Sequence, residues 1–564
     1  MGRSHRPDVQ PDRGRTDTRA DRRDCLAGRR VALAAMAVLL ALCCPACADP
    51  ITDPMGPGRV DYLIIAPEAL AEPCEPLLEL RRQQGLATAL VTTQSLVAAM
   101  GRDRLAPADI VAFLTHAAGD WGLRFVLLVG DAVGPEDLIV PMSVEPGGYF
   151  SDRFLSEREL ATDYLYSALG QEEPVLYVGR FPAGTPEELA AMVGKTIAYE
   201  TETAPGPWQR KLSFVTGNPG FDPFVDAVIT GLFIKLVSAG VPASYDVEVA
   251  DARPDSLHCT YPPEFNSNAL RLLGEGALLY VYAGHGTPTG CDDLKWQGQT
   301  YPILEAADLA QVDIEGGAPL MVAIACHTGR IDWPKGDSLG EQVMKLPRGP
   351  VAYLGASRVC QPYGNAVLAQ AILNATFETE AETVGEMLAL AKRETLQDQS
   401  TARQQADTLG ATVQGADSLP GMRRDVVRHY NLLGDPALRL RRPLGGVQLQ
   451  AQPQGGTLRV TGTVPLKEGE LIVSLEVGRE AFVRRPGRLP AATDPGLGDA
   501  MRRRYAEAND KAVARLQRPF TDGAFSVELP LPQSLAPGKY HVKVFAWNEE
   551  GAAAGAEEYI VAEL

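Results

Sequence analysis

Two short apolar segments of this chain each end on a reactive side chain, and this feature constrains the fold most. Residues 278–286 read Leu-Leu-Tyr-Val-Tyr-Ala-Gly-His-Gly, and residues 319–327 read Pro-Leu-Met-Val-Ala-Ile-Ala-Cys-His. If both segments are parallel neighbouring strands, His285 and Cys326 emerge together at the carboxyl edge of one sheet, where open α/β sheets place their ligand sites. An imidazole beside a thiol is the minimum machinery of a cysteine hydrolase.

Strand-like and helix-like segments alternate over most of the chain. Strands are predicted at 62–65, 88–91, 125–129, 175–178, 212–216, 245–249, 278–283, 320–325 and 351–354. Helices are predicted at 68–84, 107–118, 186–200, 223–239, 264–273, 340–346, 366–377, 383–396 and 425–433, and the polar stretch 398–420 is predicted to be a loop. This alternation predicts an α/β fold, with a parallel sheet covered by helices on both faces.

The chain of 564 residues is too long for one core. A proline-glycine-proline sequence at 205–207 divides the α/β part into subdomain A, 59–205, and catalytic subdomain B, 206–443. Short period-two strands follow over 444–564 and predict a β-sandwich. A charged helical stretch near 487–519 is predicted to be an insertion in one of its loops.

The amino-terminal 48 residues have the features of a secretory signal peptide. Arg29-Arg30 precedes a continuous apolar run over 31–43, and small residues follow at Ala46-Cys47-Ala48. The run is short for a membrane span. A short anchor and lipid attachment at Cys47 stay open as alternatives. The mature chain is therefore predicted to be secreted, periplasmic or at the cell surface, with no stable membrane span.

The net charge and the number of cysteines limit the possible functions further. Removing residues 1–48, which hold nine Arg and five Asp, changes the net charge from −18 to −22. Nucleic-acid partners are excluded on this ground, because phosphate binding needs a basic surface. Five cysteines remain, at 74, 259, 291, 326 and 360, and an odd number in an exported protein leaves at least one thiol unpaired.

Cys326 is the predicted nucleophile and His285 the predicted base. His327 is the weaker candidate, because neighbouring residues on a strand point to opposite faces. The backbone N–H groups of Gly286 and Cys326 are predicted to form an oxyanion hole. The sequence contains no HExxH motif or CxxC pair, so no metal and no cofactor are predicted at the site.

Several blocks, in a specific order, resemble one known family. They are Tyr62-Leu-Ile-Ile-Ala-Pro-Glu68, Leu127-Leu-Val-Gly-Asp131, Thr162-Asp-Tyr164, Val178-Gly-Arg-Phe-Pro182, Tyr282-Ala-Gly-His-Gly286, Ala323-Ile-Ala-Cys326 and Tyr430-Asn-Leu-Leu-Gly-Asp-Pro-Ala-Leu-Arg-Leu440. In this combination the chain resembles the gingipain-type cysteine peptidases, whose fold is related to that of caspases.

The resemblance implies two stacked caspase-like subdomains followed by an immunoglobulin-like module, with His285 as base and Cys326 as nucleophile. It also implies a carboxylate that orients the histidine, near a strand that is apolar here. Asp163 and Glu173 are the candidates for this orienting role, or for a specificity acid. Structural calcium occurs in such enzymes, but no local acidic pattern in this chain identifies a site.

These features predict a secreted cysteine endopeptidase that acts on proteins or peptides through a thioester. Two alternatives stay open. One is a surface transpeptidase that transfers the acyl group to an amine, as sortases do. The other is an inactive surface protein on the same scaffold, which the unfilled carboxylate position favours and the retained Cys326 and His285 oppose.

Overall fold

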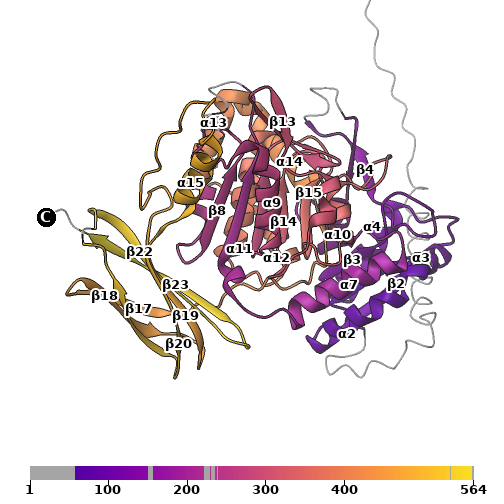
Figure 1. Ribbon diagram of the computed structural model, residues 1–564. Coiled ribbons are helices and arrows are strands. Elements are labelled where there is room, and N and C mark those ends of the chain that lie inside the picture. The colour runs from indigo at the N-terminus through magenta and orange to yellow at the C-terminus, as the bar shows by residue number, and fades with distance from the viewer. Residues whose placement is uncertain are drawn as a thin grey trace, which may run out of the picture.

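The computed structural model describes residues 58–561, apart from 150–156, 534 and several residues between 222 and 238. A large sheet with helices on both faces forms the body of the molecule, and two smaller sheets lie at the carboxyl-terminal end (Figure 1). The predicted signal peptide, 1–48, and most of the helix predicted at 223–239 lie outside the described residues. None of the described helices is long and apolar enough to cross a membrane.

The large sheet has ten strands in the order β2-β1-β3-β6-β16-β15-β14-β9-β7-β8. Their bounds are β1 Tyr62–Ala66, β2 Thr88–Thr92, β3 Phe125–Val129, β6 Tyr177–Phe181, β7 Lys211–Thr216, β8 Asp246–Asp251, β9 Leu279–Ala283, β14 Leu320–Ile324, β15 Ala352–Ala356 and β16 Tyr430–Leu433. Three hairpins lie outside it: β4 Ser143–Pro146 with β5 Glu159–Thr162, β10 Gly286–Thr287 with β11 Gly290–Cys291, and β12 Asp293–Trp296 with β13 Gln299–Pro302. The predicted α/β class is confirmed.

Strand β16 joins two halves of the sheet that run in opposite directions. It is antiparallel to β15 and parallel to β6, whereas the strands within each half are parallel to one another. At the join Leu433 pairs with Arg180, and the N–H of Gly434 donates to the Arg180 carbonyl oxygen at 2.8 Å. The predicted subdomains 59–205 and 206–443 therefore contribute neighbouring parts of one sheet.

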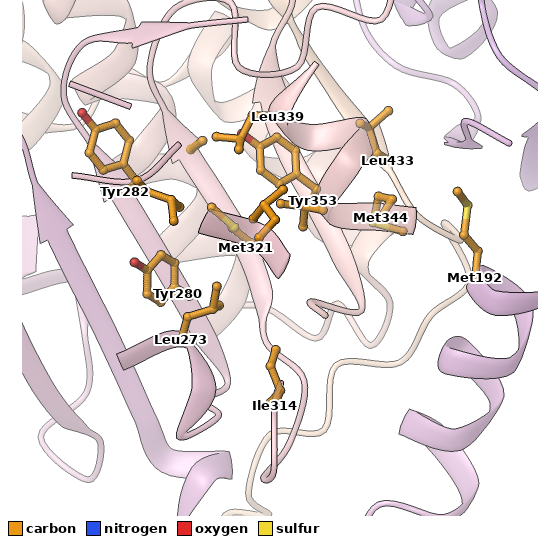
Figure 2. Close-up of a cluster of buried hydrophobic side chains, with 14 of the residues drawn as sticks. Met192, Leu273, Tyr280, Tyr282, Ile314, Met321, Leu339, Met344, Tyr353 and Leu433 are labelled. Atoms are coloured by element: carbon orange, nitrogen blue, oxygen red, sulfur yellow. The ribbon is translucent and has the colours of Figure 1, made fainter. Parts of the chain in front are cut away.

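Helices cover both faces of this sheet, as the continuous apolar strands require. One face packs against α2 Glu75–Gln83, α7 Pro186–Thr201, α9 Phe265–Gly274 and α10 Leu339–Lys345. The other face packs against α3 Thr93–Met100, α4 Pro107–Asp120, α6 Tyr164–Ala168, α11 Pro362–Phe377, α12 Val384–Gln397 and α14 Leu419–His429. Figure 2 shows the first face, where Tyr280, Met321 and Tyr353 lie in register on β9, β14 and β15.

The carboxyl-terminal part consists of two antiparallel sheets that share one core. The first has the order β17-β18-β21 and the second the order β20-β19-β22-β23. Leu458 and Val527 from the first sheet and Val473 and Val544 from the second lie in the same buried cluster. The bounds are β17 Gln448–Gln454, β18 Thr457–Thr463, β19 Gly469–Val477, β20 Ala512–Phe520, β21 Ala524–Pro530, β22 Gly538–Trp547 and β23 Ala552–Val561. The immunoglobulin-like topology stays a prediction.

A helix inserted between β19 and β20 returns to the large sheet. This helix, α15 Leu497–Asn509, lies beside β8 (Figure 1). The Asn509 side chain accepts from the Val249 N–H at 2.9 Å and donates to the Val249 carbonyl oxygen at 3.0 Å. The insertion thereby pairs part of an exposed sheet edge. The predicted insertion at 487–519 is too long, because 512–519 belongs to strand β20.

The prediction of a loop over 398–420 is wrong. Helix α13 covers Thr401–Gln414, and α14 begins at Leu419. The Ser400 hydroxyl accepts from the Arg403 N–H at 3.2 Å and caps the start of α13. The helix buries few of its side chains, and Leu409 and Val413 stay more than a third exposed. Its apolar spacing was therefore too weak to predict it, although the cap residue was visible in the sequence.

A buried arginine connects α2, α7 and the turn after β16. The Arg81 side chain is fully buried, and its Nη2 lies 2.6 Å from Asp435 Oδ2. Its Nη1 lies 2.9 Å from Glu200 Oε2 on α7. Gln84 completes the network by accepting from Arg81 Nη1 at 2.6 Å. Because every charge here is buried, removal of the arginine leaves two carboxylates without their partner.

We expect Arg81→Met to lower the free energy of unfolding by about 3–5 kcal/mol, because Asp435 and Glu200 would stay buried and unpaired. The matched control is Arg82→Met on the same helix, since Arg82 is largely exposed and its nearest carboxylate is 3.5 Å away. Its loss should stay below about 1 kcal/mol. Urea unfolding followed by tryptophan fluorescence measures both. Equal losses in the two variants would contradict the structural role given to the Arg81 network.

Candidate active site

The candidate site lies at the ends of four neighbouring parallel strands. Strands β7, β9, β14 and β15 end at the same edge of the sheet. Ala283 on β9 is in register with Ile324 on β14, and His285 and Cys326 each follow two residues later. Adjacent strands lie about 4.8 Å apart. Both side chains line one cavity of about 740 Å³, and the pairing of this thiol with this imidazole stays a prediction.

The glycines that flank His285 are required by close packing. A Cβ atom at Gly286 would lie 2.5 Å from the Cys326 carbonyl oxygen, and one at Gly284 would lie 3.0 Å from Gly217 Cα and 2.6 Å from the Tyr282 hydroxyl. No side chain fits at those distances. The two glycines therefore let the histidine turn approach both the nucleophile strand and the loop after β7.

His285 is oriented by backbone oxygen and by a buried tyrosine. Its Nε2 lies 2.7 Å from the Pro219 carbonyl oxygen, which can only accept a hydrogen bond. Nε2 therefore carries the proton in the neutral ring, and Nδ1 keeps the lone pair that a base needs. The Tyr282 hydroxyl donates to the His285 carbonyl oxygen at 2.7 Å, and the Phe221 ring lies 5.4 Å from the imidazole.

Cys326 is the cysteine best placed to react. All five described cysteines are free, and the other four are buried whereas Cys326 is partly exposed. The N–H of Cys360 donates to Cys326 Sγ at 3.3 Å, just before α11 begins. Burial raises the pKa of the Cys326 thiol, this N–H lowers it, and the Glu157 charge raises it. The balance is an elevated pKa, so the resting group is a neutral thiol.

His327 and Glu157 form a polar pair beside Cys326. His327 has a φ of 60°, which is uncommon for a residue with a side chain. Its Nδ1 lies 3.6 Å from Glu157 Oε1, and burial lowers the pKa of the imidazole. Glu157 also accepts from the Val359 N–H at 3.1 Å. His327 is not among the described residues that line the cavity.

The two predicted orienting acids lie elsewhere. Asp163 pairs with the buried guanidinium of Arg180 at 2.7 Å. Glu173 accepts a hydrogen bond from Gln397 at the end of α12. Neither acid is among the described residues that line the cavity. The position beside His285 Nε2 is occupied by the Pro219 carbonyl oxygen instead.

The backbone N–H groups of Gly286 and Cys326 lie close to the Cys326 side chain, and their role as an oxyanion hole stays a prediction. Gly286 pairs with Cys291 in the hairpin β10–β11 and packs against the Cys326 backbone. The N–H of Cys326 interacts with its own sulfur and lowers its pKa. Sequence reasoning missed Cys360 and Pro219, although each follows a predicted strand at the same sheet edge.

One group of carboxylates among the described residues has its oxygen atoms within 4.8 Å of one another: Asp131, Asp337 and Glu341. Burial and the Asp131 charge raise the pKa of Glu341 to about 8. Each carboxylate already has a partner, since Ala132 N–H, Lys345 and Ser338 donate to Asp131, Asp337 and Glu341 respectively. We therefore assign no metal to this group. Structural calcium stays an expectation without an assigned site.

The chain is similar to known peptidases of one family. The model of Peptidase family C25 matches residues 56–441. Lys-gingipain of Porphyromonas gingivalis is 26% identical over 306 residues, which are 53% of this chain and 16% of that protein. Lys-gingipain HG66 from the same organism is 25% identical over 306 residues, which are again 53% of this chain and 16% of that protein. The chain thus spans a small part of these relatives. The crystal structure of the Arg-specific cysteine proteinase gingipain R has 16% identity and a TM-score of 0.49, covering 89% of this chain and 98% of that one.

We expect Glu157→Gln to move the pH dependence of Cys326 alkylation to lower pH. Iodoacetamide reacts with the thiolate, and loss of the Glu157 charge lowers the thiol pKa, so the thiolate forms at lower pH. Glutamine keeps an acceptor for the Val359 N–H. The matched control is Glu159→Gln, an exposed side chain two residues away. Alkylation rates followed by peptide mass spectrometry give both midpoints, and an unchanged midpoint in Glu157→Gln would contradict the electrostatic role.

Proposed function

Because this chain belongs to peptidase family C25 and is therefore a cysteine-type peptidase, we propose that it hydrolyses peptide bonds with Cys326 as nucleophile and His285 as base. One observation carries the assignment of residues. The register of β9 and β14 brings these two side chains to adjacent strand ends on the wall of the same cavity. Proteins and peptides are the proposed substrates, and the substrate preferences in the names of the relatives stay with those proteins.

The proposed reaction begins with proton transfer. The elevated pKa of Cys326 favours a neutral thiol, so His285 Nδ1 removes the proton as the sulfur attacks the substrate carbonyl carbon. The imidazolium keeps its Nε2–H on the Pro219 carbonyl oxygen, which supports the positive ring. This sequence differs from attack by a preformed thiolate, because the proton moves during the first bond-forming step.

Acylation then follows the usual course of a thiol peptidase. The N–H groups of Cys326 and Gly286 are proposed to bind the oxyanion of the tetrahedral intermediate. His285 returns its proton to the leaving amine, and a thioester forms on Cys326. Water activated by the same imidazole hydrolyses the thioester. An amine in place of water would give the transpeptidase reaction, which uses the same residues.

The walls of the cavity favour an extended chain with apolar side chains. Phe221 lies against His285, and the α11–α13 side contributes Val367, Ala369 and Leu409. Phe221 and Leu409 are more than a third exposed, so apolar substrate groups gain by covering them. Export through the segment 1–48 is part of the proposal, and that segment lies outside the described residues.

We expect Cys326→Ala to lower kcat/KM on a quenched-fluorescence peptide library by at least about 1,000-fold. Among the described residues, the other cysteine that lines the cavity with His285 is Cys360, and its thiol is buried. His285→Ala should lose about 100- to 10,000-fold through the missing base. The control Cys259→Ala removes a cysteine outside the cavity lining and should keep its rate. Circular dichroism checks that all three variants fold.

Persistent hydrolysis by Cys326→Ala would contradict the assignment.

Adding glycinamide to the wild-type reaction distinguishes water from an amine as the acceptor of the acyl group. A free acid as the only product supports hydrolysis, whereas an amide adduct that dominates at millimolar amine would favour the transpeptidase alternative.

A further inference from the structure

A second thiol lies next to the proposed nucleophile and has no part in the reaction above. Cys326 Sγ is 3.3 Å from the backbone nitrogen of Cys360 and 3.7 Å from its carbonyl oxygen. We propose that Cys360 is a resolving thiol, which captures peroxide-oxidised Cys326 as a reversible disulfide. The proposal rests on the proposed function only for the role of Cys326 as nucleophile.

The topology brings these two cysteines together and keeps the others away. Strands β14 and β15 are parallel neighbours, and each cysteine follows its strand at the same edge. Cys326 and Cys360 pack on the face of the sheet covered by α11 and α12. The other three described cysteines, Cys74, Cys259 and Cys291, pack in the cluster on the opposite face. Cys360 is therefore the described thiol that shares a face with the nucleophile.

The geometry is suited to a disulfide that forms after a small side-chain movement. A sulfur in contact with both the N–H and the C=O of a residue lies beside the Cα of that residue, and disulfides need Cα atoms about 4.4–6.8 Å apart. Cys360 Sγ now contacts the Arg358 carbonyl oxygen and His429 Nδ1, each at 3.4 Å. Rotation about the Cα–Cβ bond of Cys360 is the movement that redirects its sulfur from these groups to Cys326.

Exposure decides which thiol is oxidised first. Cys326 is partly exposed in the cavity, so a hydroperoxide can reach it, whereas Cys360 is 8% exposed. The Cys326 thiol gives up its proton as its sulfur attacks one peroxide oxygen, and the O–O bond breaks. The products are a sulfenic acid and a hydroxide or alkoxide, which takes up that proton and becomes water or alcohol. The peroxide is reduced by two electrons in this step.

The second step consumes the sulfenic acid. Cys360 sulfur attacks Cys326 sulfur, the S–S bond forms and the S–O bond breaks. The hydroxide leaves with the Cys360 thiol proton as water. Two thiols and one hydroperoxide therefore give one disulfide, one water from this step, and the one water or alcohol formed in the first step. A dithiol reductant restores both thiols by exchange. The disulfide removes the nucleophile from use and protects it from irreversible oxidation to sulfinic acid.

The test treats folded wild-type protein with equimolar hydrogen peroxide, blocks residual thiols with N-ethylmaleimide and maps the peptides without reduction. We expect a peptide pair linked through Cys326 and Cys360, about 2 Da lighter than the two free peptides together. Dithiothreitol should then restore most of the peptidase rate. The control Cys259→Ser keeps both thiols of the proposed pair and should behave as wild type.

Cys360→Ser keeps the backbone N–H that contacts Cys326 Sγ, and Cys360→Ala provides a second variant in case serine folds poorly. In both we expect a sulfenic acid that dimedone traps, then a gain of about 32 Da at Cys326 and an activity loss that dithiothreitol does not reverse. Each variant is compared with its own untreated rate.

Two outcomes separate this proposal from the proposed function. If wild type and Cys360→Ser show the same sulfinic product and the same irreversible loss, Cys360 is not a resolving thiol, although Cys326 is still the nucleophile. If the linked peptide forms in a protein without hydrolytic activity, the thiol chemistry stands and the peptidase assignment fails.

Discussion

Two buried arginines set the geometry of the large sheet. Arg180 lies on β6 at the join between the halves, where Asp163 neutralises it and the Gly130 and Val140 carbonyl oxygens accept from its Nη1 at 2.9 and 2.8 Å. Arg81 fixes the turn after β16 through Asp435. A buried guanidinium is tolerated only with its partners in place. These pairs therefore specify where β16 sits between two halves that run in opposite directions.

The position of β16 determines the position of the site. β16 pairs with β15 over four residues, from Ala356 opposite Tyr430 to Tyr353 opposite Leu433. The segment that follows β15 carries the Cys360 N–H to the Cys326 sulfur. A shift of β16 would thus move the Cys360 N–H relative to the Cys326 sulfur. Asp163 belongs to this support, which explains why a carboxylate expected near the histidine is engaged with Arg180 instead.

The structural features that depend on the local sequence pattern could be predicted from the sequence. Apolar strands alternating with helices predicted the sheet, and residues placed just after two strands predicted His285 and Cys326 at one edge. Contacts between distant segments could not be predicted. Pro219 orients the histidine through a carbonyl oxygen that every residue type has, so its identity carries no signal. Glu157 accepts from the Val359 N–H across 202 residues of sequence, and no local pattern specifies a contact between segments so far apart.

The other flank of the site is supported by the carboxyl-terminal part of the chain. Asn509 of α15 holds Val249 on β8, and Lys543 of β22 donates to the Tyr245 carbonyl oxygen at 3.2 Å, just before β8 begins. β8 pairs with β7 along six residues, and β7 leads directly into the loop that presents Pro219 to His285. Support therefore reaches the imidazole from β8 and the thiol from β16. The site lies between these two strands. The smaller sheets and the insertion therefore contribute to the position of His285, although none of their described residues lines the cavity.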